Sequence, residues 1–269
     1  MWLAILVLAV VEGLTEFLPV SSTGHLVVAS ALLGFNPGWR EPFLVVIQLG
    51  AIAAVVFDRA PQLKRLFTSG REVFVTATIK LALGFIPSAV IGFLAHNAIS
   101  ALLKSPTGVS AAWIVGGVLI LVLDRPRPAS GPEPAPPELD LDAVTPRQAF
   151  LVGLSQCLAL WPGMSRSGAT ILGGLAVGLD RRSATLFSFY LAIPTMIAAS
   201  AYELLTFRDR LDGSGSAFAL GLAVSFVVAL ATVRWLLRYV QTHTFRPFAV
   251  YRIAAGALLL LLPPELWGG

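Results

Sequence analysis

The sequence predicts an all-α polytopic membrane protein, built as an inverted-topology repeat with six transmembrane helices and two re-entrant helix hairpins. Of its 269 residues, 56% are hydrophobic and only 13% are charged, whereas about 25% of the residues of a soluble domain are charged. Apolar runs recur along most of the chain, which indicates several membrane spans. A polar motif of the first half also returns, in altered form, in the second half.

The first hairpin is predicted over residues 2–34. Its apolar runs, residues 2–11 and 26–34, are each about half as long as the roughly 20 residues that cross a membrane. Between them lies EGLTEFLPVSSTGH, in which Pro19 interrupts helical hydrogen bonding. We therefore expect a helix, a break and a second helix that enter and leave on one side, buried in protein or lining a wet cavity. No basic segment precedes the first run, so we expect a retained helix rather than a signal peptide.

Three spans and a linker complete the first half. The expected spans are residues 42–57, 75–95 and 109–123. We interpret the basic residues 58–72 as a loop, and a Gly116-Gly117 pair in the third span predicts close helix packing. Prolines crowd residues 124–146, which predicts an extended linker outside the membrane.

The second half repeats the order of the first. Short apolar runs flank WPGMSRSG in a hairpin expected at residues 148–179, where PGMSRSG resembles PVSSTG of the first hairpin with one residue inserted. The spans expected after it are residues 183–205, 217–237 and 247–262. The two repeats, 1–123 and 147–269, each hold one hairpin and three spans and form a single membrane domain, 1–269. Because three is odd, the second repeat is inverted relative to the first.

The basic residues predict the orientation of the chain. With the N-terminus outside, twelve Lys and Arg side chains fall in cytoplasmic segments and four in external segments, in agreement with the positive-inside rule. Both termini are therefore expected outside. The cytoplasmic set is Arg59, Lys64, Arg65, Arg71, Arg125, Arg127, Arg147, Arg181, Arg182, Arg234, Arg238 and Arg246, and the external set is Arg40, Lys104, Arg208 and Arg210.

The second hairpin offers groups that suit a phosphate. Arg166 presents a planar, permanently charged fork for bidentate contact with phosphate oxygens. It stands where a helix is expected to begin, and the free N–H groups and dipole at such a position favour an anion. Ser165, Ser167 and Thr170 add hydroxyl groups. The alternative is an ordinary helix cap whose arginine reaches a lipid headgroup.

The first hairpin supplies complementary groups. Glu12 and Glu16 lie four residues apart, on one face of a helix, and carboxylate oxygens of this kind bind Mg²⁺ or Ca²⁺. Ser22 is a candidate nucleophile, and His25, three residues later on the same helical face, is a candidate base or acid. The alternative is that the glutamates pair with Arg166 only to hold the hairpins together. Polar groups this dense in a membrane segment indicate a functional site, so we expect the two hairpin tips to touch.

Other polar residues belong to the predicted site or lie outside it. Ser21 and Thr23 add hydroxyl groups to the first hairpin, and Gln48 either lines the cavity or forms an interhelical hydrogen bond. We expect Arg252, near the start of the last span, to reach the membrane surface or to be paired. The single cysteine, Cys157, excludes an internal disulfide and a cysteine-based metal cluster. No basic run is interleaved with aromatic residues, so nothing indicates nucleic-acid binding.

Four stretches resemble one family, and the likeness extends over nearly the whole chain. They are VEGLTEFLPVSSTGH at 11–25, VVIQLG at 45–50, QCLALWPGMSRSGAT at 156–170 and FAVYR at 248–252. They resemble the undecaprenyl-diphosphate phosphatases of bacteria, the bacitracin-resistance phosphatases. The resemblance implies a multi-pass inner-membrane hydrolase of phosphoric anhydrides, with its site facing the periplasm, that converts undecaprenyl diphosphate to undecaprenyl phosphate and phosphate. This recycles the lipid carrier of peptidoglycan synthesis, and because bacitracin sequesters the same diphosphate lipid, more enzyme implies resistance.

By position, the resemblance also implies roles for residues. Glu12 and Glu16 match the acidic motif, and Ser22 and His25 match the catalytic stretch. The phosphate-binding motif matches Ser165, Arg166, Ser167 and Thr170. The family is metal-dependent, which implies Mg²⁺ or Ca²⁺ as the cofactor, with Glu12 and Glu16 as its ligands.

Several alternatives stay open at this point. The terminal phosphorus could be attacked by Ser22, by His25 or by a metal-activated water. Inverted repeats with broken helices are also a transporter architecture, so the chain could flip a lipid phosphate rather than hydrolyse it, or could be a structural membrane subunit. The expected partners are undecaprenyl diphosphate and membrane lipids, with bacitracin connected only through the shared lipid, and the sequence is compatible with a homodimer.

Overall fold

The computed structural model describes residues 1–95, 106–125, 141–207, 209, 215–261 and 263, and every regular element in these ranges is a helix. The first half contains α1 (Trp2–Thr15), α2 (Ser22–Leu32), α3 (Arg40–Asp58), α4 (Ala60–Thr68), α5 (Arg71–Leu94) and α7 (Pro106–Leu123). The second half contains α8 (Pro146–Gln156), the 3₁₀ helix η1 (Cys157–Leu160), α9 (Arg166–Ala176), α10 (Arg181–Thr206), α11 (Gly215–Thr242) and α12 (Arg246–Leu261).

One expected loop contains a helix. Residues 58–72 were expected to be irregular, but α4 occupies most of them. Pro61 suits the first turn of this helix, where its missing N–H would have no partner in any case. Leu66 is buried and Leu63 packs against the core, so a short apolar stripe holds an otherwise basic helix.

Within the described ranges, four helices, α3, α5, α10 and α11, are long and apolar enough to cross a membrane. The other two expected spans, α7 and α12, have 18 and 16 residues, near or below the roughly 20 that a perpendicular span needs. The chain is thus a multi-pass helical membrane protein with four long apolar helices. Residues 126–140 of the expected linker lie outside the described residues, as do Lys104, Arg127, Arg208 and Arg210 of the orientation argument.

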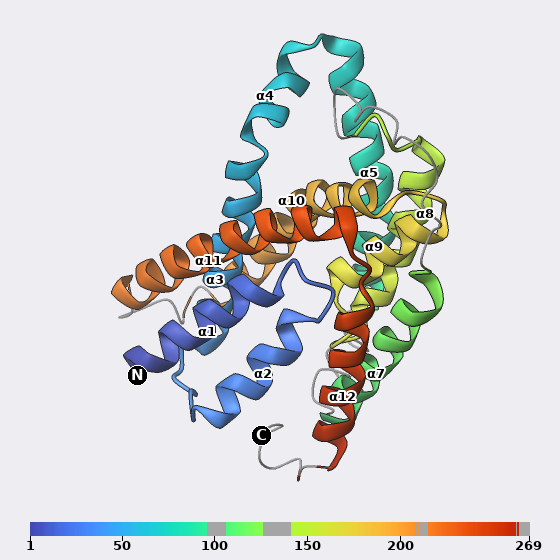
Figure 1. The fold of residues 1–269 in the computed structure, drawn as a ribbon. Helices are drawn as coiled ribbons and strands as arrows, with labels where there is room; N and C mark the ends of the chain where they lie inside the picture. Colours follow the sequence, from blue (N-terminus) through green and yellow to red (C-terminus); the bar gives the residue numbers. More distant parts are fainter. Residues whose placement is uncertain (96–105, 126–140, 208, 210–214, 262, 264–269) are drawn as a thin grey trace.

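Each broken-helix hairpin packs against the opposite half of the chain. The first hairpin is α1 and α2, and its helix α1 packs on α11; the second is α8, η1 and α9, and its helix α8 packs on α5 (Figure 1). Small residues make both contacts close. A Cβ at Gly13 would lie 2.8 Å from the Ser225 carbonyl oxygen on α11, and one at Gly153 would lie 2.7 Å from the Leu83 carbonyl oxygen on α5. The two halves are therefore interlocked rather than side by side.

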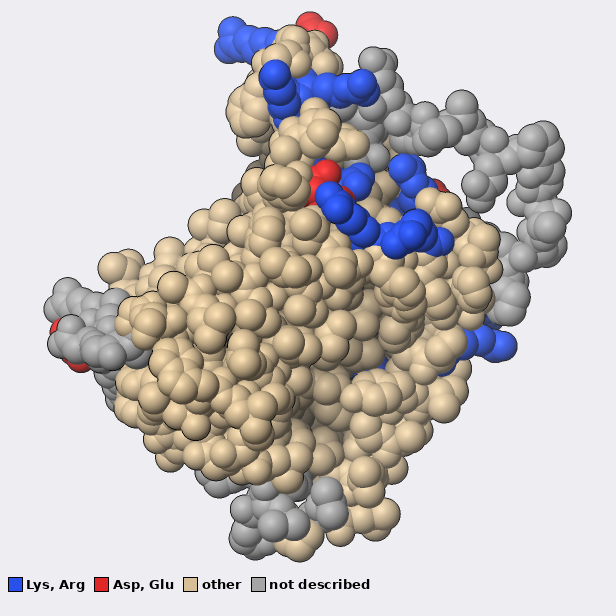
Figure 2. Space-filling model, turned by 60° about the vertical axis from the view of Figure 1, so that its left-hand side comes forward, with Lys and Arg blue, Asp and Glu red and all other residues tan. Residues whose placement is uncertain are grey.

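The charged residues concentrate at one end of the molecule. Figure 2 shows most of the Lys and Arg side chains of this face gathered toward the end where α4 lies, above a largely uncharged surface. Asp124, only 1% exposed, joins three helices there. Its Oδ1 accepts from Arg181 Nε at 2.7 Å, at the start of α10, and its Oδ2 accepts from the buried backbone N–H of Phe245, just before α12.

We predict that Asp124→Ala lowers the free energy of unfolding by about 1–3 kcal/mol, because the buried Phe245 N–H loses its acceptor and Arg181 its carboxylate. Unfolding of the purified protein by SDS in mixed micelles would measure the change. The exposed Arg238, at the same end, provides the control, and Arg238→Ala should change the free energy by less than about 0.5 kcal/mol. Equal shifts in the two variants would contradict the proposed role of Asp124.

Candidate functional site

The second helix of each hairpin begins in the same way. Ser21 precedes α2 with φ of 73°, and Ser165 precedes α9 with φ of 76°; these are the only non-glycine residues with positive φ in the described part of the chain. Their hydroxyls accept hydrogen bonds from Gly24 N at 3.5 Å and Gly168 N at 3.0 Å. A left-handed serine costs about 1–3 kcal/mol and persists only where its surroundings impose it. Two strained helix starts thus stand at matching positions of the two halves.

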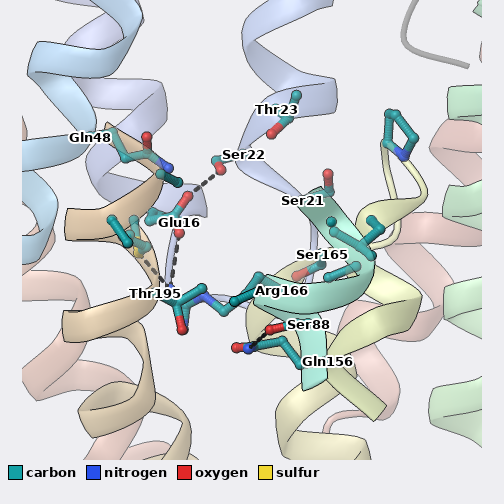
Figure 3. Close-up of a pocket in the computed structure, with 18 of the residues that line it drawn as sticks. Glu16, Ser21, Ser22, Thr23, Gln48, Ser88, Gln156, Ser165, Arg166 and Thr195 are labelled. Atoms are coloured by element: carbon teal, nitrogen blue, oxygen red, sulfur yellow. Dashed lines mark hydrogen bonds and ion pairs between the residues drawn. The ribbon is translucent and has the colours of Figure 1, made fainter. Parts of the chain in front are cut away.

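A cavity of about 740 Å³ lies where the two hairpins meet. It is lined from the first hairpin by Glu16, Ser21, Ser22 and Thr23, and from the second by Pro162, Gly163, Ser165 and Arg166 (Figure 3). Helices α3, α5 and α10 supply the other walls. Seven of the residues predicted from the sequence line this cavity: Glu16, Ser21, Ser22, Thr23, Gln48, Ser165 and Arg166.

Glu16 connects the two hairpins. Its Oε1 accepts from Arg166 Nη2 at 3.0 Å, and its Oε2 accepts a short hydrogen bond from the Ser22 hydroxyl (Figure 3). Both side chains of the ion pair are largely buried. The carboxylate therefore sits between the positive charge of one hairpin and the candidate nucleophile of the other, as expected from the complementary charges of the two motifs.

Arg166 is held by contacts that leave one donor free. Its Nη1 donates to the Ser188 carbonyl at 3.2 Å, its Nη2 lies 3.0 Å from Met196 Sδ, and its guanidinium stands over the Phe17 ring at 5.5 Å. Its buried Nε has no partner in the part of the chain that the structure describes. A guanidinium on the cavity wall is suited to an anionic ligand, although its unpaired Nε is buried.

Ser167 and Thr170 do not line the cavity; they lie behind its wall and form hydrogen bonds there. Ser167 Oγ donates to the Leu18 carbonyl of the first hairpin at 2.8 Å. Thr170 Oγ1 donates to the Arg166 carbonyl at 2.9 Å and shares a 2.7 Å hydrogen bond with Ser188 Oγ. Both are fully buried. Their hydroxyls position the arginine and the opposite hairpin instead of facing a ligand.

His25 also lies away from the cavity. Its Nδ1 is 2.7 Å from the Ser21 carbonyl, its Nε2 is 2.5 Å from the Tyr251 hydroxyl, and its ring stacks on Trp113 with centroids 4.5 Å apart. Ser22 instead turns toward Glu16. Ser22 and His25 thus have different partners in this structure, because the imidazole lies between Trp113 and Tyr251.

Glu12 and Glu16 are the two carboxylates that the sequence suggested as cation ligands. Glu12 is 1% exposed and does not line the cavity, and its Oε1 has no partner among the described residues. Within those residues no cluster of three or more His, Cys, Asp or Glu side chains forms a metal site. Mg²⁺ commonly takes one or two carboxylates and completes its shell with water and substrate phosphate. The orphaned Glu12 oxygen and the Glu16 carboxylate fit that pattern.

Sequence reasoning missed several polar residues of the cavity wall. Gln156 Nε2 donates to Ser88 Oγ at 2.5 Å, and Thr195 follows the proline of α10. Ser88 also follows a helical proline. A small polar residue next to a proline in a span is therefore a signal that could have identified Ser88 and Thr195. Gln48 meets both expectations, because it lines the cavity and accepts a 3.5 Å hydrogen bond from Ser200 Oγ on α10.

The sequence matches known proteins over almost its full length. The family described as "Bacitracin resistance protein BacA" matches residues 5–258. "Undecaprenyl-diphosphatase 1" of Burkholderia cenocepacia is 48% identical over 269 residues, covering 97% of this chain and 95% of the relative. "Undecaprenyl-diphosphatase" of Verminephrobacter eiseniae is 46% identical over 265 residues, covering 97% and 94%. The protein of the same name from Nitrosospira multiformis is 46% identical over 262 residues, covering 95% and 93%.

We predict that Ser167→Ala destabilises the fold by about 1–3 kcal/mol, because it removes the hydrogen bond from the buried Ser167 hydroxyl of the second hairpin to the Leu18 carbonyl of the first. The matched control is Thr78→Val, which removes an exposed hydroxyl bonded to a carbonyl of its own helix and should change stability by less than about 0.5 kcal/mol. SDS unfolding measures both. An equal stability of Ser167→Ala and the parent would show that this bond does not join the hairpins.

Proposed function

The chain belongs to the bacitracin resistance protein BacA family, and we propose that it hydrolyses undecaprenyl diphosphate to undecaprenyl phosphate and phosphate in the cavity between its two hairpins. Undecaprenyl-diphosphatase activity, its lipid substrate and the link to cell-wall synthesis and bacitracin resistance follow from the family. The observation that carries the assignment of the site is the Glu16 carboxylate, held between Arg166 and Ser22 on the cavity wall.

The polar end of the cavity suits the diphosphate. Ser22 and Arg166 are the first residues of α2 and α9, so two helix N-termini face the same space. Free N–H groups and the helix dipole favour an anion at such a position, and the Arg166 guanidinium adds a positive charge to the cavity wall. We place the terminal phosphate against Arg166 and the start of α9.

The apolar wall suits the isoprenoid tail. Phe85 and Phe93 on α5, Leu160 on η1 and Ala199 and Tyr202 on α10 line the same cavity. An isoprenoid tail that contacts these side chains is removed from water, and the hydrophobic effect then stabilises the bound lipid. The tail would lie between α5 and α10 and extend into the bilayer.

The Ser22–Glu16 hydrogen bond favours Ser22 as the nucleophile. Ser22 Oγ would attack the terminal phosphorus while its proton passes to Glu16 Oε2, and the bond from phosphorus to the bridging oxygen would break to release undecaprenyl phosphate. Water would then hydrolyse the phosphoserine, and the proton would return through Glu16. Arg166 would stabilise the charge on the transferring phosphoryl group, because positioning and electrostatics supply most of the catalysis in such reactions.

Two alternative routes differ in their support. Direct attack by water is compatible with the geometry, with Ser22 and Glu16 positioning that water. Attack by His25 has less support, because both of its ring nitrogens already have protein partners and His25 does not line the cavity. We propose Mg²⁺ or Ca²⁺ as the cofactor, held by Glu12 and Glu16; when bound, it would neutralise charge on the diphosphate.

The orientation follows from the ends of the helices. We assign the basic end, near α4, to the cytoplasm of a bacterial inner membrane (Figure 2). Three residues that line the cavity lie far along their helices from the basic end. They are Gly92 and Phe93, near the end of α5, and Tyr202, near the end of α10. The site would then open toward the periplasm, with both termini and six spans arranged as the sequence predicts. The comparisons give no support to the alternative of a lipid flippase.

We expect the purified protein to release phosphate from undecaprenyl diphosphate, a chelator to abolish this activity, and added Mg²⁺ or Ca²⁺ to restore it. Arg166→Ala should reduce phosphate release at least about 1,000-fold, because it removes the main positive charge of the site. Full activity in excess chelator would refute the cation, and near-normal activity of Arg166→Ala would refute the site.

We predict that Ser22→Ala also loses at least about 1,000-fold in turnover, because an alanine has no oxygen with which to form a covalent intermediate. Rapid quenching with substrate labelled at the terminal phosphate should trap label on the parent protein and none on the variant. Substantial turnover of Ser22→Ala would instead support direct attack by water.

A further inference from the structure

Arg252 on α12 has no role in the reaction proposed above, yet it is the largest of the fully buried side chains, with 1% exposure. Among the described residues, the hydrogen-bond acceptors of this guanidinium are all backbone carbonyls. Nε donates to Trp113 O at 3.2 Å, Nη1 to Pro19 O at 3.0 Å and Met164 O at 2.9 Å, and Nη2 to Ala112 O at 2.9 Å and Gly163 O at 3.1 Å. The five N–H donors of an arginine match these five acceptors.

The acceptors belong to both hairpin tips. Pro19 lies two residues before the strained Ser21, and Met164 lies directly before the strained Ser165. One nitrogen, Nη1, donates to both Pro19 O and Met164 O. Carbonyls at a helix break have no intrahelical partner, and in a membrane they must find one within the protein. Arg252 satisfies both breaks with one rigid group and so fixes their separation.

The catalytic contacts depend on this separation. Glu16 precedes Pro19 by three residues, and Arg166 follows Met164 by two, so the clamped carbonyls flank the Glu16–Arg166 pair. A displacement of about 1 Å can cost on the order of 100-fold in rate. Ser167 adds one further bond between the tips, and Arg252 bonds both tips and α7.

The sequence leaves room for the guanidinium. A Cβ at Gly116 on α7 would collide with Nη2 of Arg252, whereas a Cβ at the adjacent Gly117 would meet Ile253 Cγ1 at 2.7 Å and Ala249 O at 2.9 Å. The two glycines therefore have different functions. Gly117 allows α7 and α12 to approach, while Gly116 makes space for the arginine head.

We propose that Arg252 is a positioning residue that sets the alignment of the two hairpin tips, and through it the Glu16–Arg166–Ser22 contact. This inference rests on the proposed function. A lysine could not replace the arginine, because an ammonium group has three donors at one point and cannot reach acceptors on both sides of a planar fork. The geometry of the fork, rather than the positive charge, carries the effect.

The first test compares Arg252→Lys with the parent, as monodisperse protein in detergent and at equal folded concentration. We expect kcat to fall at least about tenfold, with KM within about threefold, because the wall that contacts the tail is unchanged and the positive charge of Arg166 is retained. Hydrogen exchange should rise in peptides covering residues 17–25 and 161–168 together and stay constant in α3 and α11. A purely structural role would raise exchange throughout the chain and leave the kcat of the folded fraction unchanged.

The second test leaves Arg252 in place and applies if Arg252→Lys does not fold. Gly116→Ala should lower kcat at least about tenfold and raise exchange at both tips, whereas Gly117→Ala, a matched change on the same helix, should do so much less. Equal losses in the two glycine variants would assign the effect to helix spacing and refute the role of the guanidinium. Lys80→Met, which removes a buried cation from the Leu141 carbonyl remote from the site, should keep kcat within about threefold.

The outcomes separate the two proposals. If the parent releases phosphate and Arg252→Lys matches it in kcat and in exchange at the tips, the positioning role is wrong and the proposed function stands. If the parent releases no phosphate, the proposed function fails. In that case, hydrogen exchange at the two hairpin tips still tests whether Arg252 aligns them.

Discussion

Broken helices within a membrane expose backbone groups that only the protein can satisfy, and the rest of this structure depends on that constraint. Two chain segments end a helix at matching positions and start another from a strained serine. Each serine caps the N-terminus of its own helix, but carbonyls at both breaks take donors from outside their own hairpin. The tips bond to each other through Ser167 and Leu18, and both bond to Arg252. The folding requirement of each half therefore brings the two motifs into contact.

The same contact creates the conditions for chemistry. A buried ion pair such as Glu16–Arg166 adds little net stability, because desolvation offsets much of the attraction between the charges. Its value here lies in placement, because it orients a carboxylate toward Ser22 and a guanidinium toward the cavity. Residues behind the wall, such as Thr170 and Ser188, complete the hydrogen bonds that hold the arginine. Stability and function are thus divided between two layers of polar residues.

The charged end of the molecule joins helices of the two halves through ion pairs. Asp124 connects the end of α7 to the starts of α10 and α12, and Asp58 connects the end of α3 to Arg234 on α11 at 2.9 Å. Both carboxylates join helices of different halves at one end of the bundle. The interlocked spans are therefore fixed at this end by ion pairs, while the tips fix the hairpins at the cavity.

The sequence by itself determined the class of the protein, nearly every helix and the two motifs of the site. Apolar run lengths and prolines suffice for this, because membrane helices obey a strict length rule and satisfy their own backbone. Helix α4 was missed because its nine residues are too few for a membrane span and its basic residues favoured a loop. Only the tertiary structure decided that His25 faces Tyr251 and Trp113 rather than the cavity, that Ser167 and Thr170 stand behind it, and that Arg252 clamps the tips. These outcomes depend on which carbonyls and rings from distant segments meet, and local spacing carries no information about such contacts.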